Sequence, residues 1–314
     1  MKTFIILTAA LLFTSCNVNT GCRTVTAEKT SFTIANWNVQ TFFDGVTEGT
    51  EYSSFKSAKY WSNEKYSTRL KRLCEVLNTL NADIYTLEEI ENEGVLQDIA
   101  NQFAGKAWDS KTNWTYACFS KEKGAAIGCA VLSKYPLFGL KTHALDIMTE
   151  SQTQPSMRPL IEVSADVNGR EIILFVNHWK SKSGGEEKSE VWRNWQEKVL
   201  QVRLDSVFNN ANPACIVSGD FNRDIDEFNE NFKSHSPWLN SEGEYSSNMG
   251  SYYYKGEWER IDHIFNFGSA EIESFCACAQ SPWITELGTP FSYTIYTGEG
   301  YSDHLPVMAT VKVN

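Results

Sequence analysis

The sequence predicts an α/β protein of the α+β type, in which β-sheets pack on each other and helices cover them from outside. The 314 residues are 42% apolar, which is enough for a large core. Short β-branched apolar runs outnumber the stretches with helical spacing. Many strands with few helices favour sheet-on-sheet packing. Residues 31–314 contain no repeat, low-complexity tract or Pro/Gly linker, and they therefore predict one domain.

The first 15 residues have the pattern of a secretory signal peptide. Lys2 precedes the apolar run Phe4–Phe13, which is shorter than the roughly 20 residues that a membrane-spanning helix needs. Cys16 follows Phe-Thr-Ser and resembles the lipidated cysteine of bacterial lipoproteins. We therefore expect a signal peptide at 1–15, lipidation at Cys16 and a flexible tether at 16–30. The protein would then be exported to the bacterial cell envelope, lipid-anchored or, after simple cleavage, secreted.

The remaining elements follow in order along the chain. The run Ile34–Val39 predicts a strand, and Asn63–Leu80 predicts a helix with Tyr66 and four leucines on one face. A second helix is predicted over Ser189–Phe208, with an apolar stripe at Val191, Trp195, Val199, Val202 and Val207. Further strands are predicted at Ile84–Ile90, Ile127–Leu132, Leu160–Val167, Ile172–Val176, Cys215–Val217, Arg260–Phe267 and Val307–Val313.

Charge and cysteine content limit the classes of function. With 28 basic and 39 acidic residues the net charge is −11, which excludes a fold that grips nucleic acid along an all-basic surface. An enzyme that acts on phosphate through a bound cation remains allowed. Excluding Cys16, seven cysteines remain, so pairing would leave at least one thiol over. Cys276 and Cys278 are two apart in a predicted strand and point to one face. No cysteine spacing predicts a zinc site.

Polar residues recur where the predicted strands end, which is where rigid elements can carry a site. Asn38, Glu89 and Asp303 offer the hard oxygen ligands that magnesium or calcium prefers over zinc. Each such residue alone has an ordinary explanation, as a solvated carboxylate, a structural histidine or a turn asparagine. The full collection favours a site, and it comprises Asn38, Glu88, Glu89, Glu91, Asn177, His178, Asp220, Asn222, Asp262, His263, Asp303 and His304.

Six segments together resemble the ordered motifs of the endonuclease/exonuclease/phosphatase superfamily, whose fold is that of pancreatic deoxyribonuclease. They span residues 37–307 and are Trp37-Asn38-Val39, Leu87-Glu88-Glu89, Asn177-His178, Gly219-Asp220-Phe221-Asn222, Arg260-Ile261-Asp262 and Ser302-Asp303-His304-Leu305-Pro306-Val307. The resemblance implies a four-layer sandwich, two packed mixed β-sheets flanked by α-helices. It also implies a catalytic domain over 31–314 and a magnesium-dependent phosphoric diester hydrolase, with calcium or manganese as alternative ions.

The resemblance also implies roles for single residues. Glu89 would be the main metal ligand, with Asn38 and Asp303 beside it. The catalytic group would contain Asp220, which orients or deprotonates the attacking water, and His178, which protonates the leaving oxygen. It would also contain His304, which contacts the phosphate, and Asp262, which holds His304. The residues implied to bind the substrate phosphate are Arg158, Asn177 and Asn222.

The chain also departs from the family pattern. Glu88 stands where the family often has Gln, and we expect it to add a charge beside the metal. Gln40 stands where some branches have an acidic residue, which leaves metal coordination on that side open. The Pro-Ala-Trp-Cys-Asp-Arg motif of inositol polyphosphate phosphatases is absent, which disfavours that branch.

The substrate is predicted to be nucleic acid, most directly DNA and alternatively RNA. The segment 177–185 is similar to exported bacterial nucleases of the superfamily. Residues 180–203 carry six basic and four acidic side chains. This small excess of positive charge predicts either a basic edge that binds a phosphate backbone or an ordinary solvated helix face. Tyr252-Tyr253-Tyr254 would stack bases, or be half-buried strand residues.

Two alternatives stay open. A phospholipid phosphodiesterase such as a sphingomyelinase would need a membrane-inserting hairpin, for which Pro282-Trp283-Ile284 is the sole candidate. A non-catalytic lipid-anchored binding protein on the same fold is the other. For the preferred nuclease, the sequence implies membrane contact only through the N-terminal lipid and no protein partner.

Overall fold

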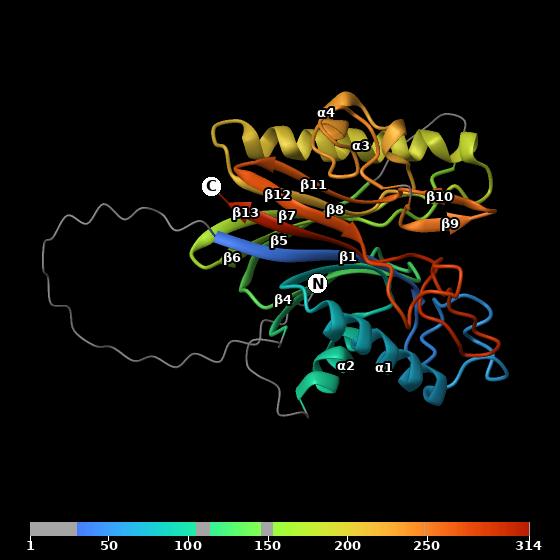
Figure 1. The fold of residues 1–314 in the computed structure, drawn as a ribbon. Coiled ribbons are helices and arrows are strands. Elements are labelled where there is room, and N and C mark those ends of the chain that lie inside the picture. Colours follow the sequence, from blue (N-terminus) through green and yellow to red (C-terminus); the bar gives the residue numbers. More distant parts are fainter. Residues whose placement is uncertain (1–29, 105–113, 146–152, 248, 314) are drawn as a thin grey trace, which may run out of the picture.

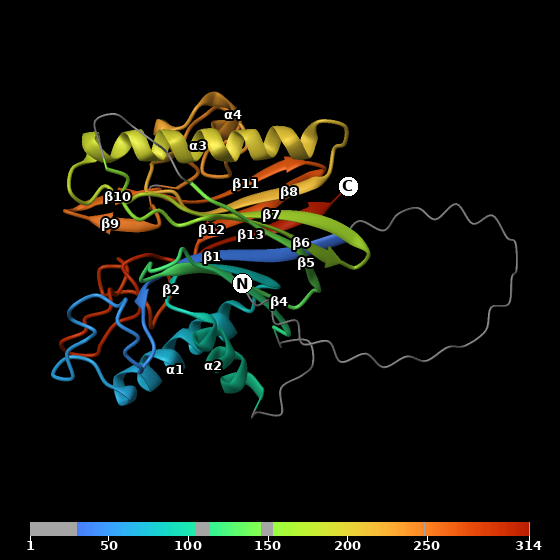
Figure 2. The same cartoon turned by 180° about the vertical axis from the view of Figure 1, so that it is seen from behind.

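The computed structural model describes residues 30–104, 114–145, 153–247 and 249–313. Two β-sheets pack face to face, and helices cover the outer face of each (Figures 1 and 2). This confirms the predicted four-layer sandwich. The predicted signal peptide, Cys16 and residues 16–29 of the tether lie outside the described residues. Within the described ranges, no helix is both long and apolar enough to cross a membrane.

The first sheet has the strand order β12-β13-β1-β2-β4-β3. Its central strands β1 and β2 run parallel, and this register places Asn38 beside Glu88. The helices α1 (Asn63–Leu80) and α2 (Glu93–Ala104) cover its outer face. The bounds of its strands are β1 Thr30–Phe42, β2 Ile84–Ile90, β3 Tyr116–Ser120, β4 Gly128–Ser133, β12 Ala270–Ala277 and β13 Val307–Val313.

The second sheet has the order β11-β8-β7-β6-β5. Its strands β7 and β8 are parallel, with His178 opposite Asp220, and β11 is antiparallel to β8, with Asp262 opposite Asp220. The helix α3 (Glu186–Phe208) and the short α4 (Glu230–Lys233) lie on its outer face (Figure 1). The bounds of its strands are β5 Leu137–His143, β6 Leu160–Val167, β7 Arg170–His178, β8 Ala214–Asp220 and β11 Asp262–Gly268.

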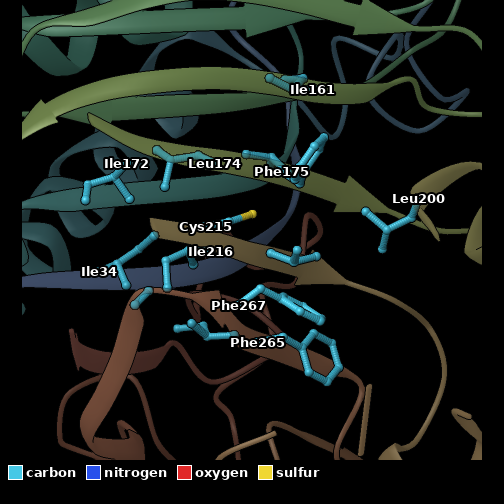
Figure 3. Packing of buried hydrophobic residues seen from close by; sticks show 14 of the residues in the cluster. Ile34, Ile161, Ile172, Leu174, Phe175, Leu200, Cys215, Ile216, Phe265 and Phe267 are labelled. Carbon is cyan, nitrogen blue, oxygen red and sulfur yellow. The ribbon is translucent and has the colours of Figure 1, made fainter. Parts of the chain in front are cut away.

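The main core fills the space between the two sheets and continues under α3. Figure 3 shows Ile34 of β1 near Ile172 and Leu174 of β7, with Ile216 of β8 between the sheets. All four side chains are fully or almost fully buried. A second buried cluster joins the first sheet to α1 and α2. Burial of apolar area contributes roughly 25 cal/mol per Å², so these two clusters provide most of the driving force that holds the strand ends in place.

The predicted stripe on α3 is confirmed in part. Val191, Val199 and Val207 are half-buried and pack against the main core, whereas Val202 is 64% exposed. The most deeply buried residues of the helix are Trp192, Leu200 and Leu204, together with the polar side chains of Arg193 and Gln196. Arg193 is tolerated there because its guanidinium donates to Glu190 and to the carbonyl oxygen of Lys180.

Further elements complete the structure. A small hairpin, β9 (Tyr252–Tyr254) and β10 (Glu257–Glu259), forms a separate two-stranded sheet, so the tyrosine run is in a strand, as one of its two interpretations required. The sequence did not predict the edge strands β3 and β5 or the helix α2. Each is short or largely exposed, so the apolar alternation that marks a buried strand is weak in them.

Gly219 allows the close approach of β7 and β8 beneath the site. A Cβ atom at this position would lie 2.0 Å from the carbonyl oxygen of Asn177, and φ is +148°. We therefore expect Gly219→Ala to lower the free energy of unfolding by about 2 kcal/mol or more, through backbone strain plus overpacking. Urea denaturation followed by circular dichroism measures the change. Gly288→Ala is the matched control, because its φ is also positive while no atom lies within 4 Å of the added Cβ. Equal losses in the two variants would show that the close approach is not the cause.

Candidate active site

Side chains from both sheets meet at one end of the sandwich. The amide nitrogen of Asn38, in β1, lies 2.9 Å from Asp220 Oδ2 and 3.4 Å from Glu89 Oε1. The Nε2 atom of His178, at the end of β7, lies 3.6 Å from Asp220 Oδ2 and 3.8 Å from Glu89 Oε1. These four predicted residues therefore form one contact group that bridges the two sheets.

A second group adjoins the first through Asp220. His304 Nδ1 lies 2.8 Å from Asp262 Oδ2, and His304 Nε2 lies 3.9 Å from Asp303 Oδ1. One side-chain nitrogen or oxygen from each of Asp220, Asp262 and His304 lies within 4.8 Å of the others, and all three residues are buried. The register between β8 and β11 makes this possible, because it places Asp262 directly opposite Asp220.

The three predicted phosphate-binding residues are placed differently. Arg158 Nη2 and Asn222 Nδ2 both donate to the carbonyl oxygen of Trp179, at 2.7 and 3.2 Å. The side chain of Asn177 is turned to other partners. Its Oδ1 accepts the indole hydrogen bond of Trp179, its Nδ2 donates to Ser218, and the residue is 2% exposed. Arg158 and Asn222 thus border the site, and phosphate binding by Asn177 stays a prediction.

Three hydrogen bonds fix the carboxylate of Asp220. Asn222 donates its backbone N–H to Oδ1 at 2.8 Å, and Oδ2 accepts from Asn38 Nδ2 at 2.9 Å and from Asn222 Nδ2 at 3.1 Å. Burial raises the pKa of Asp220 to about 7, against the lowering effect of the His304 charge and with a further increase from Asp262. A carboxylate whose pKa is close to neutrality suits a general base.

The two histidines have opposite electrostatic environments. Burial disfavours the charged form of His304, but the charge of Asp262 and its hydrogen bond outweigh this and raise the pKa of His304 well above its usual value. Burial, followed by the charges of Arg158 and His304, lowers the pKa of His178 well below its usual value. His304 is therefore the imidazolium and His178 the neutral imidazole.

Several residues at the site have a strained backbone. Gln40, Thr41, Glu89 and Asn222 have φ between +46° and +66°, a region that non-glycine residues rarely adopt. In this conformation the backbone N–H of Thr41 donates a hydrogen bond to Glu89 Oε2 at 2.5 Å, which holds the Glu89 carboxylate in place. The pairing of β1 with β2 is irregular in this stretch, between Asn38 and Phe42. Such strain is concentrated at functional sites.

Glu88 differs from its prediction. It is fully buried, and neither carboxyl oxygen has a hydrogen-bond partner. Burial, with the nearby charges of Asp262 and Asp220, raises the pKa of Glu88 well above its usual range. These conditions favour the neutral acid, whereas the sequence predicted an additional negative charge beside the metal.

The residues present fit a hard divalent cation. Burial raises the pKa of Glu89, and the charge of Asp303 raises it further, so the carboxylates repel each other in the protein alone. Asp262 Oδ1 is buried without a partner. Oxygen ligands with excess negative charge favour magnesium, calcium or manganese. Asn38 directs its side-chain nitrogen to the carboxylates of Glu89 and Asp220, and its side-chain oxygen accepts from the backbone N–H of Gln40 at 2.9 Å.

Three of the six basic residues of the predicted basic edge form internal ion pairs. Arg193 is fully buried against Glu190, Arg203 lies 3.0 Å from Glu162, and Lys182 lies within 4.0 Å of three different carboxylates. Lys180 lies near enough to the site for its charge to contribute to the lowered pKa of His178. The proposed membrane hairpin is also not supported, because Trp283 is 1% exposed and its indole donates to the carbonyl oxygen of Cys278.

The chain was compared with known protein families and structures. A model of the endonuclease/exonuclease/phosphatase family matches residues 33–270. No curated protein matches the chain.

Several solved structures share the fold. The human nocturnin catalytic domain with bound sulfate is 17% identical, with a TM-score of 0.61, and the match covers 90% of this chain and 95% of that one. An endonuclease/exonuclease/phosphatase family protein from Bacteroides thetaiotaomicron is 15% identical, with a TM-score of 0.58 and coverages of 91% and 99%. Danio rerio TDP2 complexed with single-strand DNA product is 14% identical, with a TM-score of 0.57 and coverages of 90% and 98%.

Proposed function

Because the chain belongs to the endonuclease/exonuclease/phosphatase family, we propose that it is a divalent-metal-dependent phosphodiesterase that hydrolyses the backbone of DNA, with RNA as the alternative substrate. Enzymes of this family are usually metal-dependent phosphoesterases. The observation that carries the proposal is the convergence of Asn38, Glu89, Asp220 and His304, whose contacts are given above, on one end of the sandwich.

The roles follow from the contacts and the charges. Asp220, with both oxygens held, orients the attacking water and accepts its proton. The imidazolium of His304, held by Asp262, donates to a phosphate oxygen and stabilises the charge that grows in the transition state. A divalent cation held by Glu89, with Asn38 and Asp303 beside it, would supply further stabilisation of that charge.

The leaving oxygen would be served by His178. Since the ring of His178 is neutral, we assign it a hydrogen bond from Nε2–H to that oxygen rather than the transfer of an imidazolium proton. Arg158 and Asn222 would hold the remaining phosphate oxygens. Each of these three residues carries a group that can donate a hydrogen bond to an oxygen on which negative charge develops.

The β9–β10 hairpin supports nucleic acid as the substrate. The ring of Tyr252 lies 4.8 Å from that of His304, and Tyr254 stacks on Tyr252 with centroids 6.2 Å apart and planes 21° apart. Tyr254 is 51% exposed, and the ammonium of Lys255 lies 5.0 Å from its ring. Aromatic rings next to a cation are the usual platform for unpaired bases. The TDP2 structure with single-strand DNA product shows that a protein of this fold accommodates such a strand.

Tyr254→Ala is expected to weaken binding of a single-stranded oligonucleotide by about 5- to 150-fold, since base–aromatic stacking contributes about 1–3 kcal/mol per base. Fluorescence anisotropy in the Asp220→Asn background measures binding without cleavage. Tyr253→Ala is the matched control, because that neighbouring ring packs against Trp258 at 5.1 Å on the other face of the strand. An equal loss in both variants would contradict a stacking role for Tyr254.

A panel of phosphodiesters tests the proposed function. Purified protein is incubated with plasmid DNA, RNA, sphingomyelin and bis(4-nitrophenyl) phosphate, with magnesium and with excess EDTA. Chelator-sensitive cleavage of DNA or RNA supports the nuclease, and release of phosphocholine would support the lipid alternative. No cleavage of any substrate would contradict the proposal. Nuclease activity should also fall with added salt, because contacts to the phosphate backbone release counterions.

We further propose export, with lipid on Cys16 as the anchor. The support is the sequence of residues 1–16 alone. A Cys16→Ser variant should move from the membrane fraction to the soluble fraction of the producing bacterium. Mass spectrometry of the wild-type N-terminus should show a diacylglyceryl group, and an unmodified chain that begins elsewhere would contradict the anchor.

A further inference from the structure

Two cysteines that do not belong to the site described above lie close together at the end of β12. The Sγ atoms of Cys276 and Cys278 are 3.7 Å apart. Cys276 is exposed on the edge strand of the first sheet, whereas Cys278 is 9% exposed. An accessible sulfur therefore lies directly against a covered one.

The backbone holds the covered cysteine in place. Cys278 donates its N–H to the carbonyl oxygen of Pro306 at 2.7 Å and accepts the indole hydrogen bond of Trp283 at 2.6 Å. Cys276 forms the last but one ladder pair of β12 with β13, opposite Met308. Cys276 is thus the member that an external reagent can reach, and Cys278 is fixed beneath it.

The two thiols differ in acidity because they contact each other. The hydrogen bond from Cys278 lowers the pKa of Cys276 to about 7, although burial opposes this, and the same bond with burial raises the pKa of Cys278. Burial, followed by the charges of nearby carboxylates, raises the pKa of Cys129 and Cys215. Since the thiolate is the nucleophile, reactivity near neutral pH is expected at Cys276.

We propose that Cys276 and Cys278 are a thiol–disulfide exchange pair, in which exposed Cys276 attacks an external disulfide and covered Cys278 resolves the adduct. The oxidant class is a disulfide of a small thiol, such as oxidised glutathione. The inference stands independently of the proposed phosphodiesterase activity, because none of its groups belongs to that site.

The exchange proceeds in two balanced steps. The Cys276 thiolate attacks one sulfur of the external disulfide, whose S–S bond breaks, and the first small thiolate leaves and takes a proton from water. Cys278 then loses its proton to water and attacks Cys276 Sγ, so that the mixed disulfide breaks and the second small thiolate leaves. Two protein thiols are oxidised and one external disulfide is reduced. Rotation of the exposed Cys276 side chain brings the sulfurs to the roughly 2 Å of a disulfide bond.

Intact-mass and peptide-mass measurements test the pair. The full mature chain is incubated with excess oxidised glutathione at pH 7.5, quenched with acid and digested without reductant. The wild-type peptide that contains both cysteines should lose two hydrogen atoms and keep no glutathione, and dithiothreitol should restore it. Cys278→Ser should keep one glutathionyl group on residue 276. Cys276→Ser should react at least about tenfold more slowly at 278, because thiolate fraction and access both fall.

The outcomes separate the proposal from general thiol reactivity. Cys118, which is half-buried and has a pKa raised to about 12 by burial, is the internal control in every digest and should stay unmodified. A stable glutathionyl group on wild-type Cys276, equal to that in Cys278→Ser, would overturn the resolving role. Absence of any reaction at Cys276 in wild type would overturn the pair. The wild-type result does not depend on how either variant folds.

Discussion

Asp220→Asn is expected to lower kcat for phosphodiester hydrolysis by about 10²–10⁴-fold, the usual contribution of a positioned acid or base. The amide cannot accept the proton of the attacking water. It has a single oxygen, so it can accept either from the backbone N–H of Asn222 or from the side-chain amides of Asn38 and Asn222, which now reach different oxygens of the carboxylate. The fold should be retained. Burial and the charge of Asp262 raise the pKa of Asp220, and removal of the carboxylate therefore relieves repulsion.

The measurement is steady-state hydrolysis of plasmid DNA and bis(4-nitrophenyl) phosphate, with circular dichroism and thermal unfolding of the same preparations. His304→Ala should also remove most turnover, because it deletes the cationic donor. Asp205→Asn is the matched control, since this aspartate is exposed on α3. A wild-type rate in folded Asp220→Asn would refute the role of a general base.

The second large effect is expected from removal of the cation or of its main ligand. Excess EDTA should reduce hydrolysis to background, and Glu89→Gln should raise the magnesium concentration for half-maximal activity by about 100-fold or more. Loss of a residue that only supports a ligand already costs about 10- to 100-fold in metal affinity. Magnesium should raise the unfolding temperature of wild type and not that of Glu89→Gln, because binding to the folded state stabilises it.

The same variant has an expected pH dependence in metal-free buffer. The pKa of Glu89 in the folded protein is raised above its ordinary value of 4.5. Protonated Glu89 therefore contributes stability that is fully present below pH 4.5 and is lost as the pH rises through the raised value. Glu89→Gln should lose less stability than wild type across that window. Activity that survives EDTA, or a magnesium response in Glu89→Gln equal to wild type, would contradict the assigned metal site.

The part of the fold that could be predicted from the sequence is the set of buried strands, because their residues stand out as short runs of β-branched and apolar side chains. The run Ile84–Ile90 is buried along nearly its whole length, and it is a strand with the predicted bounds. The helix Asn63–Leu80 was also predicted to the residue from its apolar spacing, and in the structure Ser62 caps its first turn. α3 was predicted with only part of its buried face, since the buried Arg193 and Gln196 carry no apolar signal.

The candidate site was predictable from motif order rather than from spacing. Asn38 and Asp220 are 182 positions apart, and their contact depends on sheet packing that no local pattern encodes. The neutral state that its surroundings favour for Glu88 depends on burial and on neighbouring charges, which appear only in three dimensions. The same holds for the opposite environments of His178 and His304, which the sequence presents as two equivalent imidazoles.

The backbone carbonyl oxygen of Trp179 links two loops, because it accepts hydrogen bonds from Arg158 on one loop and from Asn222 on the other. Trp179 itself is held by its indole ring, which packs against Phe221 and Phe228 with ring centroids 4.8 and 5.6 Å apart. Folding therefore orders both donors before a phosphodiester binds. The conformational entropy of their side chains is lost during folding, so the free energy of binding does not have to offset that loss.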